Sequence, residues 1–267
     1  MDVRAVLTKD GRFGYEEAGR ADAPPLVFLH GIGGAARGWR RQLQDFSPSW
    51  RAVAWDMPGY GRSAPLPMVS IATLAQALTD FLATAGIERP VLVGHSIGGM
   101  IVQQFIADHP EAARAVVLAQ TSPSFGRPDG DWQKQFIADR LGPLDRGETM
   151  AQMAPALVAA MVGEAPDPAG VALARDCMAA TAPESYRGVM LALTGFDLKD
   201  ALGRIAVPTM ALAGTKDANA PATMMRRMAH AIPGAHYVEL EGCGHLANLE
   251  RPEAFSALLR DWLETLS

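Results

Sequence analysis

The fold is decided by residues 91–100, which read Val91-Leu92-Val93-Gly94-His95-Ser96-Ile97-Gly98-Gly99-Met100. The apolar run at their start is typical of a buried parallel strand, and the apolar stretch over 100–107 has the length and spacing of a helix. Side chains at 94 and 98 would collide with the neighbouring strand and helix, and so short a connection forces its central residue into a strained backbone conformation. We therefore expect Ser96 to lie at the tip of a sharp turn, with its hydroxyl presented above a sheet.

A glycine-rich strand-to-helix turn can also be purely structural, because a short motif predicts little without its context. Here the strand before the turn and the helix after it are both predicted, and this context favours a nucleophilic serine. Whether the turn is catalytic or structural then depends on chemical partners for Ser96 further along the chain.

Around this turn, short apolar strands alternate with helical patterns, which indicates a parallel sheet buried between helices. Strands are predicted over 26–29, 52–55, 115–119, 209–214 and 236–240, and a hairpin of two more strands over 3–8 and 12–16. Helices are expected near 36–45, 71–82 and 220–231, with a closing amphipathic helix over 255–266. The predicted fold class is α/β, with a mostly parallel eight-stranded sheet and helices on both faces.

The alternation stops between residues 122 and 200, where no convincing strand is found and helices are predicted over 149–162 and 168–180. We interpret this segment as a helical cap inserted over the sheet. The predicted organisation is a core part at 1–121, the cap at 122–200 and a second core part at 201–267. Four methionines of the cap are expected to lie in the core more than against a substrate: Met150, Met153, Met161 and Met178. Three arginines of the cap are candidate partners for a substrate carboxylate: Arg140, Arg175 and Arg187. For each arginine, an exposed position on a helix is the simpler expectation.

A serine hydroxyl is a weak nucleophile at neutral pH, so Ser96 needs a base, and that base needs an orienting acid. Asp217 follows the predicted strand 209–214, and His245 follows the strand 236–240. The carboxyl ends of parallel strands meet at one edge of the sheet, so the three side chains can meet despite their separation. Taken singly, Asp217 also fits a turn or cap residue and His245 a loop histidine; together with Ser96 they predict a catalytic triad in the order Ser, Asp, His.

A tetrahedral intermediate also needs two amides aimed at one oxygen. The amide of Ile97 lies in the first turn of the predicted helix, and the glycine-rich loop His30-Gly31-Ile32-Gly33-Gly34 offers the second donor. We assign it to Ile32, with Gly31 or Gly33 as alternatives. His30 and His95 are interpreted as residues that position these loops. The loop lacks the third glycine of a dinucleotide-binding motif.

Composition narrows the classes of function. The 267 residues carry a net charge of −5, with no basic character that would favour nucleic acid or an anionic membrane. The two cysteines, Cys177 and Cys243, have no metal-ligand spacing and are expected to be small apolar fillers. No apolar run approaches a membrane span, and residues 1–12 do not resemble a signal peptide, so a cytoplasmic protein is expected. A homodimer remains compatible with the sequence.

With these residues in place, the chain resembles the α/β-hydrolase fold family from about residue 24 to residue 266. The motifs that carry the resemblance are His30-Gly31, Asp56-x-x-Gly59-x-Gly61-x-Ser63, Gly94-His95-Ser96-Ile97-Gly98-Gly99, Asp217 and His245. The C-terminal third is similar to 3-oxoadipate enol-lactonase-like enzymes and carboxylesterases in the stretches 197–198, 204–209 and 245–255. The cap lacks the Arg-Trp-Phe type of segment associated with enol-lactonases.

The expected function is therefore a serine hydrolase that needs no metal or other cofactor and cleaves a small carboxylic ester or lactone through an acyl-enzyme on Ser96. Hydrolysis of a carbon–carbon bond, as in aromatic catabolism, is the alternative within the enzyme class. A small-molecule receptor that keeps the fold without turning over is the alternative from another class. Turnover discriminates an enzyme from a receptor, because a receptor should hydrolyse slowly or stop after one equivalent, whereas an enzyme should cycle.

Overall fold

A single eight-stranded sheet runs through the computed structural model, which describes residues 2–127 and 130–266; residues 1, 128, 129 and 267 of the predicted core and cap segments lie outside it. The strand order is β1-β2-β4-β3-β5-β6-β7-β8. β1 pairs antiparallel with β2 and β2 with β4, while all other pairs are parallel. The predicted mostly parallel sheet and its hairpin are confirmed. The strands are β1 (Arg4–Leu7), β2 (Gly14–Ala18), β3 (Pro25–Leu29), β4 (Arg51–Trp55), β5 (Val91–His95), β6 (Ala115–Ala119), β7 (Thr209–Gly214) and β8 (His236–Leu240).

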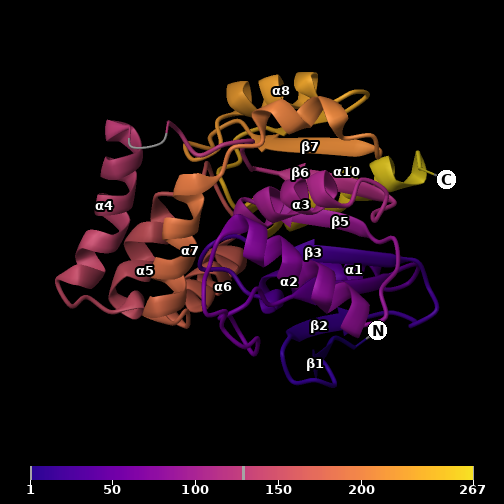
Figure 1. The fold of residues 1–267 in the computed structure, drawn as a ribbon, viewed down its shortest axis with the longest axis horizontal. Coiled ribbons are helices and arrows are strands. Elements are labelled where there is room, and N and C mark those ends of the chain that lie inside the picture. Colours follow the sequence, from indigo (N-terminus) through magenta and orange to yellow (C-terminus); the bar gives the residue numbers. More distant parts are fainter. Residues whose placement is uncertain (1, 128–129, 267) are drawn as a thin grey trace.

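Helices cover both faces of the sheet and create two separate cores (Figure 1). One face packs against α2 (Ile71–Thr84), α3 (Ile97–Asp108) and α8 (Ala222–Ala231), and the other against α1 (Arg40–Phe46) and α10 (Pro252–Glu264). Successive strand residues point to opposite faces, so Val27 belongs to the first core and its neighbour Phe28 to the second. This explains why the strands read as continuous apolar runs.

The helix boundaries follow local sequence signals. Ser70 caps α2 in a capping box with Thr73. The helix predicted over 36–45 begins as a 3-10 turn (Ala36–Trp39) and continues as α1. None of the helices within residues 2–127 and 130–266 has the length and apolar character needed to cross a bilayer.

Between β6 and β7, helices α4 (Asp131–Asp145), α5 (Met150–Ala159), α6 (Pro168–Ala179) and α7 (Pro183–Ala192) gather beside one end of the sheet (Figure 1). We call these four helices the cap. The helices predicted over 149–162 and 168–180 are observed as α5, which Thr149 caps, and α6, which starts with Pro168. Two short 3-10 helices (Leu193–Gly195 and Lys199–Arg204) lead the chain back to β7.

The middle of the cap segment, as well as its two ends, contacts the part of the chain that forms the sheet. A backbone bridge pairs Ser124 with Asp197, close to the two ends of the cap segment. The connection between α5 and α6 contacts the loop after β8: the Glu164 amide donates to the Gly242 carbonyl at 2.7 Å, and the His245 amide donates to the Met161 carbonyl at 2.6 Å. The middle of the cap therefore shares backbone hydrogen bonds with the loop that carries His245.

Candidate active site

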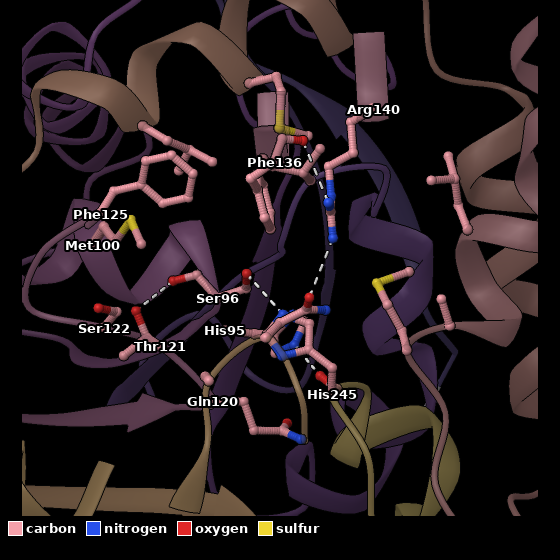
Figure 2. Close-up of a pocket in the computed structure, with 18 of the residues that line it drawn as sticks. His95, Ser96, Met100, Gln120, Thr121, Ser122, Phe125, Phe136, Arg140 and His245 are labelled. Atoms are coloured by element: carbon pink, nitrogen blue, oxygen red, sulfur yellow. Dashed lines mark hydrogen bonds between the residues drawn. The ribbon is translucent and has the colours of Figure 1, made fainter. Parts of the chain in front are cut away.

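Ser96 lies in a strained turn between β5 and α3. Its φ and ψ are 54° and −121°, in a region that residues with a Cβ rarely adopt. A Cβ built on Gly98 would lie 2.6 Å from the Leu29 carbonyl oxygen, and one on Gly94 would lie 2.5 Å from the Gly98 carbonyl oxygen. The clashes predicted for both positions are confirmed. The turn directs the Ser96 hydroxyl toward His245 inside a cavity (Figure 2).

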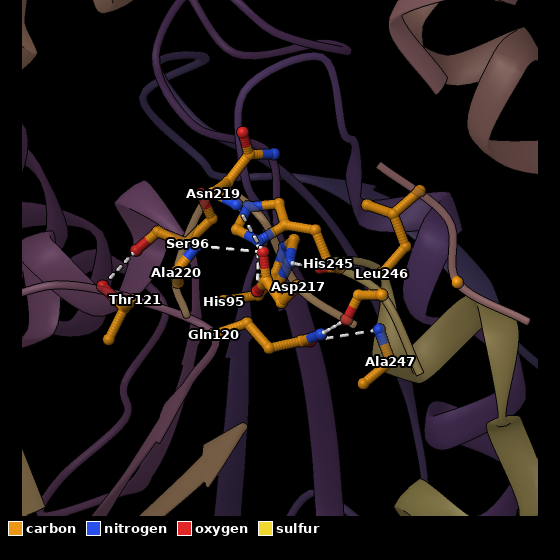
Figure 3. A network of polar contacts seen from close by, with 12 residues as sticks. His95, Ser96, Gln120, Thr121, Asp217, Asn219, Ala220, His245, Leu246 and Ala247 are labelled. Carbon is orange, nitrogen blue, oxygen red and sulfur yellow. Dashed lines mark hydrogen bonds and ion pairs between the residues drawn. The ribbon is translucent and has the colours of Figure 1, made fainter. Parts of the chain in front are cut away.

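The structure brings the three predicted catalytic side chains together. His245 Nε2 lies 3.0 Å from Ser96 Oγ, and His245 Nδ1 lies 2.7 Å from Asp217 Oδ2 (Figure 3). The second carboxylate oxygen of Asp217 accepts the backbone amides of Asn219 and Ala220 at 2.8 and 2.9 Å. The Asp217 carboxylate is thereby fixed in position, and its free edge faces the imidazole.

The environment of Asp217 favours its charged form. Burial raises the pKa of the Asp217 carboxyl, but the His245 charge, its hydrogen bond and the two amides together lower the pKa below the usual value. An ionised Asp217 accepts a hydrogen bond from His245 Nδ1–H, which leaves Nε2 unprotonated and free to accept the proton of Ser96. This is the protonation state that a general base beside a serine requires.

Residues at the ends of β5 and β6 brace this arrangement (Figure 3). His95 Nε2–H donates to the His245 carbonyl at 2.6 Å, and burial followed by the nearby His245 lowers the pKa of His95 to about 3, so it stays neutral. The Gln120 amide donates to the Gly244 carbonyl and its oxygen accepts the Ala247 amide at 3.1 Å. Thr121 Oγ1 donates to the Ser96 carbonyl at 2.6 Å. The prediction that His95 positions a loop agrees with this geometry, whereas sequence reasoning gave Gln120 and Thr121 no role.

Glu250, in the short helix α9 (Ala247–Glu250), is a further residue that sequence reasoning missed. It is only 1% exposed, and its carboxylate accepts three backbone amides: Gly244 at 3.0 Å, Leu246 at 2.8 Å and Gly163 at 2.7 Å. The first two flank His245, and the third belongs to the connection between α5 and α6. Glu250 thus holds the His245 loop and the cap in one fixed arrangement.

The predicted oxyanion donors lie on both sides of Ser96. Ile97 is the first residue of α3, and a Cβ on Gly31 would lie 3.1 Å from the Ser96 Cβ, so the loop that carries Ile32 packs against the serine. Across residues 2–127 and 130–266, the Ile32 and Ile97 amides have no hydrogen-bond acceptor. Two free donors beside the nucleophile are what an oxyanion site needs.

His30 fixes the conformation of that loop. Its Nδ1 lies 2.8 Å from the Gly31 carbonyl, and its Nε2 accepts the Met57 amide at 3.0 Å. Because Nε2 accepts, Nδ1 carries the proton and donates to the carbonyl. Burial lowers the pKa of His30, which keeps this neutral tautomer. Asp56 holds the other side by accepting the Ala36 amide at 2.8 Å.

Ser96 and His245 open into a cavity of about 160 Å³ that the cap covers (Figure 2). Its wall is largely apolar, which suits a small organic ligand. The cap helices and the connection after α5 supply nine of the residues that line it: Trp132, Phe136, Arg140, Leu157, Ala160, Met161, Met178, Tyr186 and Met190.

The side chains predicted for the cap divide between two environments. Met150, Met153 and Met178 are core residues, as expected, and Met178 also lines the cavity. Met161 is partly buried and lines the cavity. Arg175 is exposed and Arg187 pairs with Asp145 on the outer surface, as expected. The expectation of an exposed position is wrong for Arg140, which lines the cavity because α4 turns this residue inward.

Both cysteines are buried, free thiols, in agreement with the prediction of small fillers. Burial raises the pKa of Cys243 to about 12 and raises that of Cys177. Within the part of the chain that the structure describes, no group of three or more His, Cys, Asp and Glu side chains is placed to hold a metal ion.

Comparisons with known proteins agree with this architecture. A protein named "Putative carbamate hydrolase RutD" from Klebsiella pneumoniae subsp. pneumoniae is 31% identical over 259 residues, which cover 91% of this chain and 92% of that protein. The enol-lactonase from Burkholderia xenovorans LB400 superposes with a TM-score of 0.85 at 27% identity, over 98% of this chain and 100% of that chain. A thermophilic esterase from Thermogutta terrifontis, at 23% identity, gives a TM-score of 0.86 over 100% of this chain and 99% of that chain, which is a likeness of fold.

The resemblance to enol-lactonase-like and esterase-like members of this fold is therefore confirmed. Carbamate hydrolysis, which the name gives to the RutD relative, is an activity of that protein that sequence reasoning did not weigh. The model of the alpha/beta hydrolase fold family matches residues 24–252, which include Ser96, Asp217 and His245. The family match, the RutD relative and the enol-lactonase support a hydrolase. The chain belongs to the alpha/beta hydrolase fold family.

Proposed function

We propose that the chain is a serine hydrolase that cleaves a small carboxylic ester or lactone through an acyl-enzyme on Ser96 and uses no cofactor. The observation that carries the proposal is the hydrogen-bonded series from Ser96 through His245 to Asp217, with contacts of 3.0 and 2.7 Å. This geometry provides a nucleophile, its base and the acid that orients the base.

In the proposed mechanism, Ser96 Oγ attacks the substrate carbonyl while His245 Nε2 takes the hydroxyl proton. The oxygen of the tetrahedral intermediate accepts the Ile32 and Ile97 amides. His245 then protonates the leaving alkoxide as the tetrahedral intermediate collapses: the bond to the leaving oxygen breaks, the carbonyl re-forms, and an acyl-serine remains. Water attacks the acyl group with His245 again as the base, which releases the acid and restores Ser96. Asp217 stabilises the imidazolium formed in each half-reaction.

The proposal of an ester or lactone rests on the apolar wall of the cavity and on the enol-lactonase neighbour at 27% identity. Cleavage of a carbamate is a second candidate, because the relative at 31% identity carries that name and the same attack on a carbonyl would serve it. A carbon–carbon hydrolase and a receptor remain the alternatives to be tested.

The test compares wild type with Ser96→Ala on p-nitrophenyl esters from acetate to octanoate, with a p-nitrophenyl carbamate and a simple lactone in parallel. We expect many turnovers with the esters or the lactone and a loss of at least ~10³-fold in the variant, since removal of a triad member costs on this order. Ser49→Ala is the matched control, because Ser49 is exposed and distant in sequence from the site. Labelling by a fluorophosphonate, mapped by mass spectrometry, should modify Ser96 alone.

Hydrolysis that persists in Ser96→Ala would contradict the serine mechanism. Turnover of the carbamate alone would replace the ester assignment. A single equivalent of product without further turnover would favour the receptor.

A further inference from the structure

Among residues 2–127 and 130–266, the cavity wall contains one permanently charged side chain, Arg140 of α4. The ionisable side chains that line it are His95, Tyr186, His245 and Arg140. His95 and Tyr186 are neutral at neutral pH, since burial lowers the pKa of His95 to about 3 and raises that of Tyr186 to about 12. Arginine remains protonated in proteins. The charge of Arg140 is therefore the fixed charge that a ligand meets.

Arg140 forms no ion pair with an acidic side chain of residues 2–127 and 130–266. Its neighbour Asp139 acts on it through its charge, but the Asp139 carboxylate accepts a hydrogen bond from Gln135 instead. Its guanidinium carbon lies 3.4 Å from the centre of the Phe136 ring, which shields one face. One guanidinium nitrogen contacts the Phe136 carbonyl at 3.4 Å, and the other donates to Asn219 Oδ1 at 3.3 Å. A guanidinium has five N–H donors, so donors remain for a ligand.

The orientation of Arg140 links it to the proposed catalytic acid. Asn219 accepts from the Arg140 side chain, and the Asn219 backbone amide donates to Asp217. Figure 2 shows the Arg140 side chain extending from α4 toward His245, with the Phe136 ring beside it. The cation is thus directed into the cavity that Ser96 and His245 also line.

A half-buried cation in an apolar wall has lost part of its hydration without gaining an ion pair. Burial lowers the pKa of Arg140, which is the sign of that unfavourable environment. A bound anion would restore the missing interaction. A planar carboxylate matches the two parallel donors of a guanidinium edge.

We propose that Arg140 binds a carboxylate of the substrate, so that the preferred substrate is a small ester or lactone carrying a second, free carboxylate. The inference rests on the proposed function and deepens it. The role of Arg140 is to place the scissile carbonyl against Ser96 by holding the far end of the molecule. Arg175 and Arg187 do not share this role, because both lie outside the cavity wall.

The kinetic test compares two substrates with the same reacting bond, the mono-p-nitrophenyl ester of adipic acid and its methyl-capped diester. We expect wild type to prefer the free acid. Arg140→Met should lower kcat/KM for the free acid by roughly 10- to 100-fold, the range for a charged hydrogen bond, and change it less than about 3-fold for the diester. Arg140→Lys should recover part of the loss. Arg175→Met is the matched control and should change neither value.

The binding test does not depend on turnover. Calorimetry with the Ser96→Ala variant should detect adipate, and the double variant with Arg140→Met should not. Equal losses of kcat/KM on both substrates would overturn the carboxylate assignment, and so would equal adipate binding with and without Arg140. In either case, Ser96-dependent turnover of the diester would still support the hydrolase. Absence of Ser96-dependent turnover with retained, Arg140-dependent adipate binding would instead reject the hydrolase alone.

Discussion

The carboxylate of Glu250 shows how much of the site depends on a residue that performs no chemistry. It accepts amides from both sides of His245 and from Gly163 in the cap. A hydrogen bond to a charged acceptor is worth about 1.5–3 kcal/mol, and a buried donor left unpaired costs a similar amount. Glu250 therefore stabilises the loop conformation that presents His245.

Glu250→Gln should lower the free energy of unfolding by about 2 kcal/mol or more, because the new NH₂ group faces amide donors. Urea denaturation measures this change, and kcat for an ester should fall as His245 loses its fixed position. The matched control is Glu253→Gln: Glu253 is 72% exposed and pairs with Arg41 at the surface, so its loss should cost at most about 0.5 kcal/mol. Equal effects of the two substitutions would mean that Glu250 has no special role.

The buried histidines predict how stability depends on pH. The pKa of His95 is lowered from 6.5 to about 3 in the folded protein, so below pH 6.5 the unfolded chain binds a proton that the folded chain does not. The contribution of His95 to the free energy of unfolding is fully present above pH 6.5. It is lost at about 1.4 kcal/mol per pH unit as the pH falls toward 3. His30 acts in the same direction.

Urea denaturation at pH 7 and pH 5 tests this linkage. The free energy of unfolding of wild type should fall by about 2 kcal/mol through His95 over this interval, because pH 5 lies about 1.5 units below the unfolded pKa of 6.5. His95→Gln, which has no titrating ring, should lose about 2 kcal/mol less than wild type between the two pH values. His236→Gln, at an exposed position, should behave as wild type does. An unchanged pH dependence in His95→Gln would refute the assignment.

At the scale of elements, the β5–α3 turn is fixed by close backbone contact. A Cβ on Gly98 would overlap the carbonyl oxygens of Leu29 and His30, at 2.6 and 2.9 Å. Those carbonyls lie at the end of β3, directly before the loop that carries Ile32. Any displacement there shifts the proposed oxyanion donor relative to Ser96.

Gly98→Ala should therefore destabilise the fold by about 2 kcal/mol or more and lower kcat, in contrast to the usual gain from replacing a helical glycine. Gly188→Ala in α7 is the control, because its Cβ would meet only the Val69 side chain at 3.4 Å. That substitution should stabilise the protein by up to about 1 kcal/mol. Thermal unfolding and ester kinetics compare the two; stability equal to wild type in Gly98→Ala would show that the contact relaxes.

The elements that sequence predicts well are those with a strict local pattern. The buried strands, the turn at Ser96 and the loops after β7 and β8 follow from apolar runs and glycine positions, so the contact among Ser96, Asp217 and His245 could be anticipated. α4 could not be placed in this way, because its apolar side chains Trp132 and Phe136 line a cavity instead of a continuous core. Arg140 and Glu250 are charged residues in partly or fully buried positions, and only the tertiary contacts around them reveal this.

At the scale of the whole molecule, the cap and the sheet meet through backbone as well as through side chains. A Cβ on Gly163 would meet the backbone of Gly242 and Gly244, and the Met161 carbonyl accepts the His245 amide at 2.6 Å. Neither Gly163 nor Gly244 lines the cavity. A change there should act on catalysis through the His245 loop.

Gly163→Ala should lower kcat by at least about 10-fold with little change in KM, because the methyl group would push the cap connection away from the His245 loop. Steady-state ester kinetics and the rate of fluorophosphonate labelling of Ser96 both report this effect. Gly195→Ala is the control, since its Cβ would meet nothing within 4 Å. A higher KM with an unchanged kcat would indicate that the cap affects only ligand binding.

The hydrogen bond between the Met161 carbonyl and the His245 amide also limits how such a protein can be recombined. A chimera that exchanged the cap at its two ends would discard the carbonyl that accepts the His245 amide, together with the cap's part of the cavity wall. Substrate range and catalytic competence are therefore inherited as one unit in this chain. A productive graft would need to carry residues 161–164 of the host, or a donor cap whose central connection offers the same carbonyl and glycine.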